Sequence, residues 1–183
     1  MKAKSRILIA VIAMLTSMPG TVSAQKAAET APDSTGYIVR DGDMAPDFSI
    51  RLTDGRTVKL SDLRGKVVLL QFTASWCIVC RREMPSLEND IWQRHKDNKD
   101  FVMIGVDYDE PIEKIMNFAS KVGVTYPLGL DPSGKIFCLY AKEQSGVTRN
   151  VLIGRDGRIV MRTRLYKEKE FSDLVHKIDE LLQ

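Results

Sequence analysis

The sequence predicts an α/β domain in which a central mixed β-sheet carries helices on both faces. Two runs, Val67 to Phe72 and Phe101 to Val106, are apolar at odd and even positions alike, as expected of strands covered on both faces. Apolar residues at helical spacing follow each run, and the chain ends in a predicted hairpin and helix. Strands that alternate with helices in this way favour a layered α/β arrangement.

The first 24 residues are typical of an export leader. Three basic residues precede an apolar run from Ile7 to Leu15, and Val22-Ser23-Ala24 offers small residues at a cleavage point. The run is too short to cross a bilayer as a helix, which needs about 20 residues. We expect residues 1–24 to be a cleaved signal peptide and the protein to be periplasmic or otherwise exported, with an uncleaved anchor as the alternative.

The net charge of the chain comes from this leader. The whole sequence has 27 Lys and Arg residues against 24 Asp and Glu residues, and the leader holds three of the bases, which leaves 24 of each sign. A neutral mature chain argues against a nucleic-acid partner. After cleavage we also expect no stable insertion into a membrane.

Residues 25–42 are rich in Ala, Thr, Ser, Pro and Asp and are predicted to form a flexible linker. Residues 43–183 are predicted to form the folded domain, which opens with a β-hairpin. Asp47 to Leu52 alternates apolar and polar residues, Asp54-Gly55 supplies a favoured turn, and Thr57 to Leu60 returns.

The segment after Cys77 is predicted to be a helix that buries one face. Pro85 lies inside the pattern and should kink the helix, and Glu88 falls off the buried side. The buried seam consists of residues at helical spacing: Cys80, Met84, Leu87 and Ile91.

The second half of the chain supplies five further elements. They are a helix that opens at Glu110-Pro111, an extended piece over Pro127 to Leu130, a short helix over Ser133 to Ala141, a hairpin over Asn150 to Arg162, and a helix over about Glu168 to Leu182. Cys138 lies among apolar residues of the short helix, so we expect a packed, unreactive thiol, with a third redox cysteine as the alternative.

Cys77 and Cys80 form a CxxC pair at a junction between strand and helix. Residues three apart share one helix face with Cβ atoms roughly 5–6 Å apart, and a disulfide needs about 3.8 Å, so a modest adjustment closes the bond. Cys77 is expected at the helix N-terminus, where free N–H groups stabilise a thiolate, whereas Cys80 lies on the buried seam. We expect Cys77 to be the nucleophile and Cys80 to resolve the mixed disulfide.

A zinc site is the alternative interpretation of the two cysteines. Structural zinc needs four ligands, and the remaining candidates are Cys138, His95 and His176. None of them lies close to the CxxC pair in sequence. We therefore expect neither a metal nor any other cofactor.

Four segments carry a family resemblance: Ala45 to Phe48, Leu60 to Leu69, Phe72 to Cys77, and Arg82 to Pro85. They resemble the TlpA/ResA-like thiol–disulfide oxidoreductases, and the likeness covers roughly residues 43–183. It implies a thioredoxin-like three-layer fold and the reduction or exchange of disulfides in substrate proteins outside the cytoplasm, sometimes in cytochrome c maturation. It also implies a membrane thiol donor that re-reduces the pair.

The sequence departs from the family pattern at Thr148, which stands at the position of the family's cis-proline. The resemblance places this loop, with Val147, against the cysteines and Trp76, where it pairs with substrate. A non-proline cis bond costs about 2.5–4 kcal/mol, so the Val147–Thr148 bond is either cis under strain or trans in a differently shaped loop. The departure implies an altered substrate preference, or a harmless variant.

A second departure is Gln71, which stands where thioredoxin has a buried Asp that moves protons for the inner cysteine. A glutamine side chain cannot titrate. We expect Gln71 to satisfy local backbone groups, and any proton transfer from Cys80 to use water or another carboxylate.

These observations favour a thiol–disulfide oxidoreductase that acts on protein disulfides as a reductase. A thiol peroxidase is an alternative enzyme, since related redoxins share the Ala-Pro-Asp-Phe pattern, although Thr73 to Trp76 replaces the Pro-containing loop such an enzyme needs. A metallochaperone without enzymatic activity on the same fold is the third hypothesis.

Overall fold

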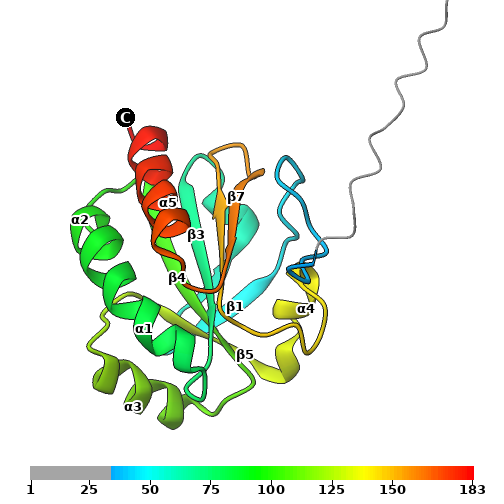
Figure 1. Ribbon diagram of the computed structural model, residues 1–183, viewed down its shortest axis with the longest axis vertical. Helices are drawn as coiled ribbons and strands as arrows, with labels where there is room; N and C mark the ends of the chain where they lie inside the picture. Colours follow the sequence, from blue (N-terminus) through cyan, green and yellow to red (C-terminus); the bar gives the residue numbers. More distant parts are fainter. Residues whose placement is uncertain (1–33) are drawn as a thin grey trace, which may run out of the picture. The chain divides into compact units, whose positions relative to one another are not determined.

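The computed structural model describes residues 34–183, and a mixed sheet of seven strands forms the centre of this part of the chain (Figure 1). The spatial order of the strands is β2-β1-β5-β4-β3-β6-β7. Their bounds are Ser49–Leu52 (β1), Thr57–Lys59 (β2), Val67–Thr73 (β3), Phe101–Tyr108 (β4), Leu128–Asp131 (β5), Arg149–Ile153 (β6) and Ile159–Arg164 (β7). The predicted signal peptide, and residues 25–33 of the predicted linker, lie outside the described residues.

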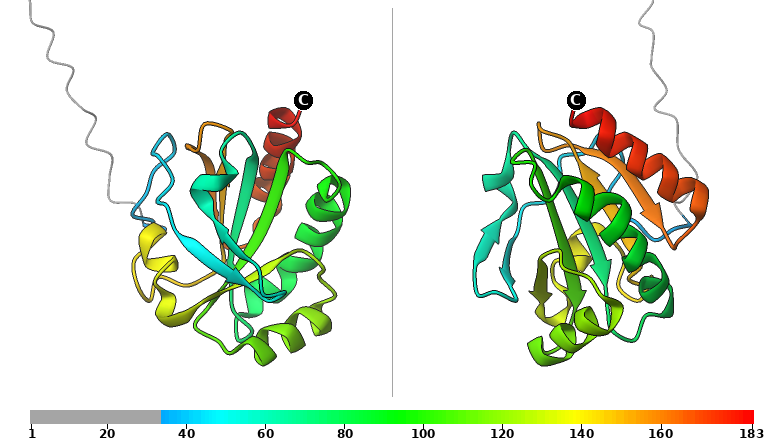
Figure 2. Two further views of the ribbon diagram at one scale, coloured as in Figure 1. Left: turned by 180° about the vertical axis from the view of Figure 1, so that it is seen from behind. Right: turned by 90° about the vertical axis from the view of Figure 1, so that its left-hand side faces the viewer.

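Strand β3 lies between β4 and β6, and all of its residues are buried. It runs parallel to β4 and antiparallel to β6, while β4 runs parallel to β5. The β6–β7 hairpin extends one side of the sheet, and the β1–β2 hairpin, cyan in Figure 2, joins the other side through β5. This mixed sheet confirms the predicted fold class and the predicted N-terminal hairpin.

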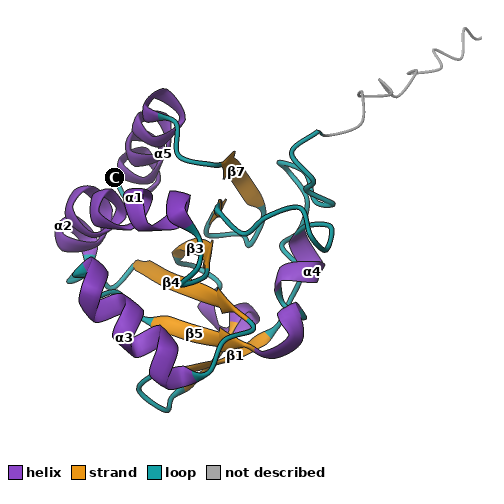
Figure 3. Cartoon of the chain, turned by 60° about the horizontal axis from the view of Figure 1, so that its bottom comes forward, coloured by secondary structure: helices purple, strands orange, loops and turns teal. Residues whose placement is uncertain are grey.

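Helices cover both faces of the sheet, as predicted (Figure 3). Alternate residues of β3 face opposite layers: the Thr73 hydroxyl contacts Met84 of α1, whereas the Phe72 ring packs against Phe137 and Tyr140 of α4. The helical segments are η1 Leu60–Leu63, α1 Ile78–Ser86, η2 Leu87–Trp92, α2 Gln93–His95, α3 Ile112–Val122, η3 Pro132–Gly134, α4 Phe137–Tyr140 and α5 Glu168–Leu181. Within residues 34–183, no helix has both the length and the apolar character that crossing a membrane requires.

The helix after Cys77 changes its winding at Pro85, where a kink was predicted. Proline has no N–H to offer the carbonyl of Arg81 and its ring crowds that carbonyl, and the wider π-helical turn η2 begins two residues later. The predicted seam is buried. Glu88, predicted to lie off that seam, is buried as well, because in the wider turn its carboxylate accepts hydrogen bonds from the main-chain N–H and the hydroxyl of Thr125, at 2.8 and 2.6 Å.

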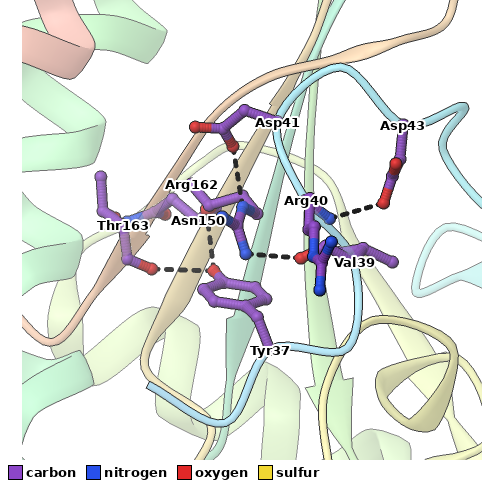
Figure 4. A network of polar contacts seen from close by, with 8 residues as sticks. All are labelled: Tyr37, Val39, Arg40, Asp41, Asp43, Asn150, Arg162 and Thr163. Carbon is purple, nitrogen blue, oxygen red and sulfur yellow. Dashed lines mark hydrogen bonds and ion pairs between the residues drawn. The ribbon is translucent and has the colours of Figure 1, made fainter. Parts of the chain in front are cut away.

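Part of the predicted linker packs against the domain. Residues 34–45 form a strap in which Tyr37 is buried. Its hydroxyl donates to the carbonyls of Asn150 and Thr163, at 3.0 and 2.8 Å (Figure 4). The guanidinium groups of Arg149 and Arg162 stack on its ring, at 4.5 and 4.9 Å from the ring centroid. The packed part of the chain therefore begins before the predicted boundary at residue 43, because Tyr37 and Val39 are buried and main-chain hydrogen bonds such as that from Ile38 N–H to the Tyr140 carbonyl join the strap to the domain.

Replacing Tyr37 by Phe should lower the free energy of unfolding by about 1–2 kcal/mol, because the carbonyls of Asn150 and Thr163 lose a buried donor. Urea unfolding measures the change. Ile38→Ala alters an exposed residue of the same strap and should change the free energy by less than about 0.5 kcal/mol. Equal stabilities for Y37F and the wild type would contradict the anchoring role.

Candidate active site

Cys77 and Cys80 form a disulfide with Cα atoms 5.3 Å apart, so the pair closes as predicted. Cys77 caps the N-terminus of α1, and its Sγ accepts the main-chain N–H of Cys80 at 3.1 Å. The two cysteines differ in solvent exposure, since 8% of the Cys77 surface is exposed and none of the Cys80 surface. The outer cysteine is therefore the one at the helix terminus, where a thiolate is favoured.

The loop that carries Cys77 is held from both sides at Ser75. The carboxylate of Glu110 accepts the Ser75 main-chain N–H at 2.5 Å and its hydroxyl at 2.7 Å. The guanidinium of Arg81 donates to the Ser75 carbonyl at 2.6 and 3.1 Å and stacks on Phe118 of α3, 5.5 Å from the ring centroid. These bonds fix where the chain leaves β3 and enters α1.

A pocket of about 280 Å³ opens over the Cys77 sulfur. Trp76, Val147 and Thr148, three residues that the resemblance implied to be near the substrate, lie together in its wall, whereas Gln71 is buried in β3 and does not line the pocket. Trp76 also borders a second pocket of about 330 Å³. The walls of the first pocket are formed by Trp76, Cys77, Ile78, Val79, Gly146, Val147, Thr148, Arg164 and Leu165.

Thr148 lies against both sulfur atoms of the disulfide. Its hydroxyl oxygen is 2.9 Å from Sγ of Cys77 and 3.2 Å from Sγ of Cys80, and the residue is almost fully buried. Every peptide bond within residues 34–183 is trans, so the Val147–Thr148 bond takes the trans alternative. The residue that departs from the family pattern is thus in direct contact with the redox pair.

Gln71 has a side-chain partner rather than the backbone partners that were expected. Its Oε1 accepts the Tyr126 hydroxyl at 2.7 Å. Its Nε2 is buried and makes no hydrogen bond within the described part of the chain. That amide nevertheless lies close enough to Glu83 to lower the pKa of the carboxyl, although the geometry falls short of a hydrogen bond.

Glu83 is a buried acid one helical turn beyond Cys80. Its Oε1 accepts Nδ2 of Asn150 at 2.7 Å, while its Oε2 has no hydrogen-bond partner among residues 34–183. Burial raises the pKa of Glu83 to about 7, against the lowering effect of the Asn150 and Gln71 amides. Sequence reasoning assigned Glu83 no role, although its three-residue spacing from Cys80 places it on the same helix face.

Asp107 is a second buried acid, at the end of β4 beside the Ser75 loop. Neither carboxylate oxygen has a hydrogen-bond partner within residues 34–183. Burial, and then the nearby charge of Glu110, raise the pKa of Asp107 to about 8. Within the same residues, no three His, Cys, Asp or Glu side chains gather in a way that could hold a metal ion. His95, one of the zinc candidates, bonds with Asp179 of α5 at 2.9 Å.

Cys138 is exposed, so the prediction of a packed thiol was wrong. Helix α4 is only one turn long and buries Phe137 and Tyr140, which leaves the side between them open to solvent. Partial burial and the charges of Glu143 and Asp131 raise the pKa of the Cys138 thiol, which disfavours the thiolate.

Glu83→Gln should remove a pH dependence of stability. The native pKa of about 7 lies above the unfolded value of about 4.3, so native Glu83 holds its proton longer. The wild type should therefore lose roughly 3 kcal/mol relative to E83Q as pH rises from about 4 to 8. Urea unfolding at both pH values tests this. E113Q, which removes an exposed carboxylate of α3, should follow the wild type, and parallel curves for E83Q and the wild type would contradict the assignment.

The sequence profile of the redoxin family matches residues 40–178. Thiol-disulfide oxidoreductase ResA of Bacillus thuringiensis is 33% identical, over 65% of this chain and 66% of the relative. Among solved structures, a candidate protein disulfide isomerase from Bacteroides thetaiotaomicron is 65% identical with a TM-score of 0.79, over 80% of this chain and 92% of that one. A candidate thiol:disulfide interchange protein DsbE from Chlorobium tepidum is 31% identical with a TM-score of 0.69, over 79% and 99% of the two chains.

The family match covers the sheet, the CxxC junction and the Thr148 loop together. They agree with the thioredoxin-like topology and with the closed Cys77–Cys80 pair. The chain belongs to the redoxin family, among its TlpA/ResA-like thiol–disulfide oxidoreductases.

Proposed function

We propose that the Cys77–Cys80 pair exchanges electrons with disulfides of substrate proteins, with Cys77 as the nucleophile and Cys80 as the resolving cysteine. The observation that carries this assignment is the unequal burial of the two cysteines. Cys77 lines the pocket beside Trp76, whereas Cys80 is fully enclosed. A substrate disulfide that docks in the pocket meets the outer sulfur first.

Two exchange steps complete the reaction. The Cys77 thiolate attacks one sulfur of the substrate disulfide, forms a mixed disulfide and releases the other substrate sulfur as a thiolate. Cys80 then attacks Sγ of Cys77, which closes the internal disulfide and releases the second substrate thiol. Two electrons pass from the protein to the substrate. The Cα separation of 5.3 Å in the closed pair lies within the range that a disulfide requires.

The direction of exchange is reduction of the substrate, outside the cytoplasm. The leader-like residues 1–24 support export, and the direction is the one that the family resemblance of the sequence segments implies. In an oxidising compartment the pair closes unless a reductant reopens it. A reductase at this location therefore requires an electron donor, which we identify by class as a membrane protein with an exposed dithiol.

The surface around Cys77 favours apolar substrate segments. Trp76, Ile78 and Leu165 all line the pocket and are among the exposed large apolar residues of the described chain. Leu165 has a left-handed backbone with φ of 65°, which is uncommon for a residue other than glycine. Strain of this kind gathers at functional sites, so we assign Leu165 to substrate contact.

Cys80→Ser should trap a mixed disulfide between Cys77 and a disulfide substrate such as insulin, because no second thiol remains to resolve it. Non-reducing electrophoresis and mass spectrometry of the adduct identify the linked cysteine. Turnover in an insulin reduction assay should fall at least about 100-fold, since resolution then depends on an external thiol.

The trapping experiment requires a Cys138→Ser background, because the exposed Cys138 is a third thiol that could form adducts. C138S alone should retain wild-type turnover. C77S/C138S should form no adduct, since its single thiol, Cys80, is enclosed. An adduct through Cys80 in that variant, or full turnover by C80S/C138S, would overturn the assignment of roles.

A further inference from the structure

The Thr148 hydroxyl occupies the space between the two redox sulfur atoms. Its distances of 2.9 Å to Cys77 and 3.2 Å to Cys80 place one oxygen within reach of both. In a disulfide neither sulfur carries a hydrogen, so the hydroxyl is the donor of these contacts. It has one proton and can direct it to only one sulfur at a time, and the shorter contact is with Cys77.

Reduction of the disulfide changes the strength of this hydrogen bond. A disulfide sulfur is a weak acceptor, whereas a thiolate carries a full negative charge, and hydrogen bonds to charged acceptors are roughly twice as strong as neutral ones. When the pair opens, Cys77 becomes a charged acceptor and Cys80 a thiol whose S–H can point to the hydroxyl oxygen. Thr148 can then donate to one sulfur and accept from the other.

The protein holds this hydroxyl in place. The Thr148 carbonyl accepts the Leu165 N–H at 3.1 Å and the Arg164 guanidinium at 3.3 Å. Gly146, two residues earlier, has φ of 85°, a left-handed backbone that glycine adopts without strain and other residues rarely adopt. The branched Cβ of threonine restricts its side chain further. The donor is thus oriented before the thiolate forms, as effective electrostatic stabilisation requires.

We propose that Thr148 is a catalytic residue whose hydroxyl stabilises the Cys77 thiolate, and so sets both the acidity of Cys77 and the reduction potential of the pair. This inference rests on the proposed function of the pair. In the reductive half-reaction, a donor dithiol and the Cys77–Cys80 disulfide give the donor disulfide, the Cys77 thiolate, the Cys80 thiol and one released proton. Two electrons pass to the protein, and the Thr148 proton stays on its oxygen.

Other charged groups lie near Cys77 or the loop that carries it. Arg164 of β7 lines the same pocket, Glu110 at the start of α3 binds the Ser75 loop, and Glu83 lies one turn deeper on α1. Arg81, on the first turns of α1, binds the Ser75 carbonyl, and the acid Asp107 of β4 pairs with Thr73 just before that loop. All of them remain when the Thr148 hydroxyl is removed. A difference between Thr148 variants therefore isolates the hydroxyl from its charged surroundings.

Thr148→Val removes the hydroxyl and keeps the shape of the side chain. The pKa of Cys77, followed by thiolate absorbance in the reduced protein, should rise by about one unit. Above both pKa values, the equilibrium constant for reduction by dithiothreitol should fall about tenfold, which corresponds to a potential about 30 mV more negative. Below both pKa values Cys77 is a thiol in each protein, and the two potentials should converge.

Two variants serve as controls. Thr148→Ser keeps the hydroxyl and should stay within about twofold of the wild type. Thr73→Val removes another buried threonine hydroxyl that contacts a sulfur, that of Met84 at 3.4 Å, which does not ionise. T73V should leave both the pKa and the potential unchanged. If T148V does not fold, T148S alone tests the inference, because it keeps the hydroxyl and should show the wild-type pKa of Cys77 and the wild-type potential. A T148S protein in which both values differ from those of the wild type would overturn the inference.

Three outcomes decide the matter. A tenfold difference that disappears at low pH supports a hydrogen bond to the thiolate. Identical values for T148V and the wild type, or an offset that persists at every pH, would overturn the inference while leaving the oxidoreductase function intact. A wild-type protein that shows no two-electron couple at all would overturn the proposed function as well.

Discussion

The complete burial of β3 is the constraint on which the active site depends. A strand covered on both faces, with partners on both edges, cannot slip in register without exposing apolar residues. Its antiparallel pairing places Phe72 opposite Arg149. Cys77 therefore follows the end of β3 at the same edge of the sheet where Thr148 precedes β6. Two residues 71 positions apart come into contact because a central strand is fixed.

The same strand pairing builds a polar cluster beneath the cysteines. Gln71 of β3 and Asn150 of β6 are paired neighbours, and both amides act on Glu83 of α1. A buried carboxyl with an unsatisfied oxygen is costly in its charged form, which explains why Glu83 retains its proton to near neutral pH. In this chain the titratable acid of the cluster therefore lies on α1, next to the inner cysteine, while the strand position that bears an acid in thioredoxin carries an amide.

The sequence was sufficient for the fold and for the cysteine pair, because those depend on local spacing. Apolar residues at both odd and even positions predicted β3 and β4, and the CxxC junction predicted the disulfide. Contacts between distant segments were harder to predict. Thr148 was identified only through the family resemblance, and its contact with both sulfur atoms depends on the register of β6. Glu88 was predicted to lie off the buried side of its helix, but it is buried because the π-helical turn shifts the helical period.

Two predictions about burial that rested on composition were wrong, for related reasons. The strap around Tyr37 has the polar composition of a linker, yet Tyr37, whose ring contacts two guanidinium groups, and Val39 are buried in the domain. Cys138 lies in an apolar run, yet a helix of one turn has too little surface to bury all its side chains. Average composition predicts burial poorly when a few residues decide how a short segment packs.

The reduction potential of the Cys77–Cys80 pair, measured by equilibration with dithiothreitol or glutathione buffers, tests the central claim most directly. A reductase that is recharged by a dithiol donor should have a potential of about −270 mV or lower. A potential near −120 mV would make the protein a donor of disulfides and would contradict the proposed direction. The gap between these values is several times larger than the shift expected from the Thr148 hydroxyl, so the direction can be decided from the wild-type protein alone.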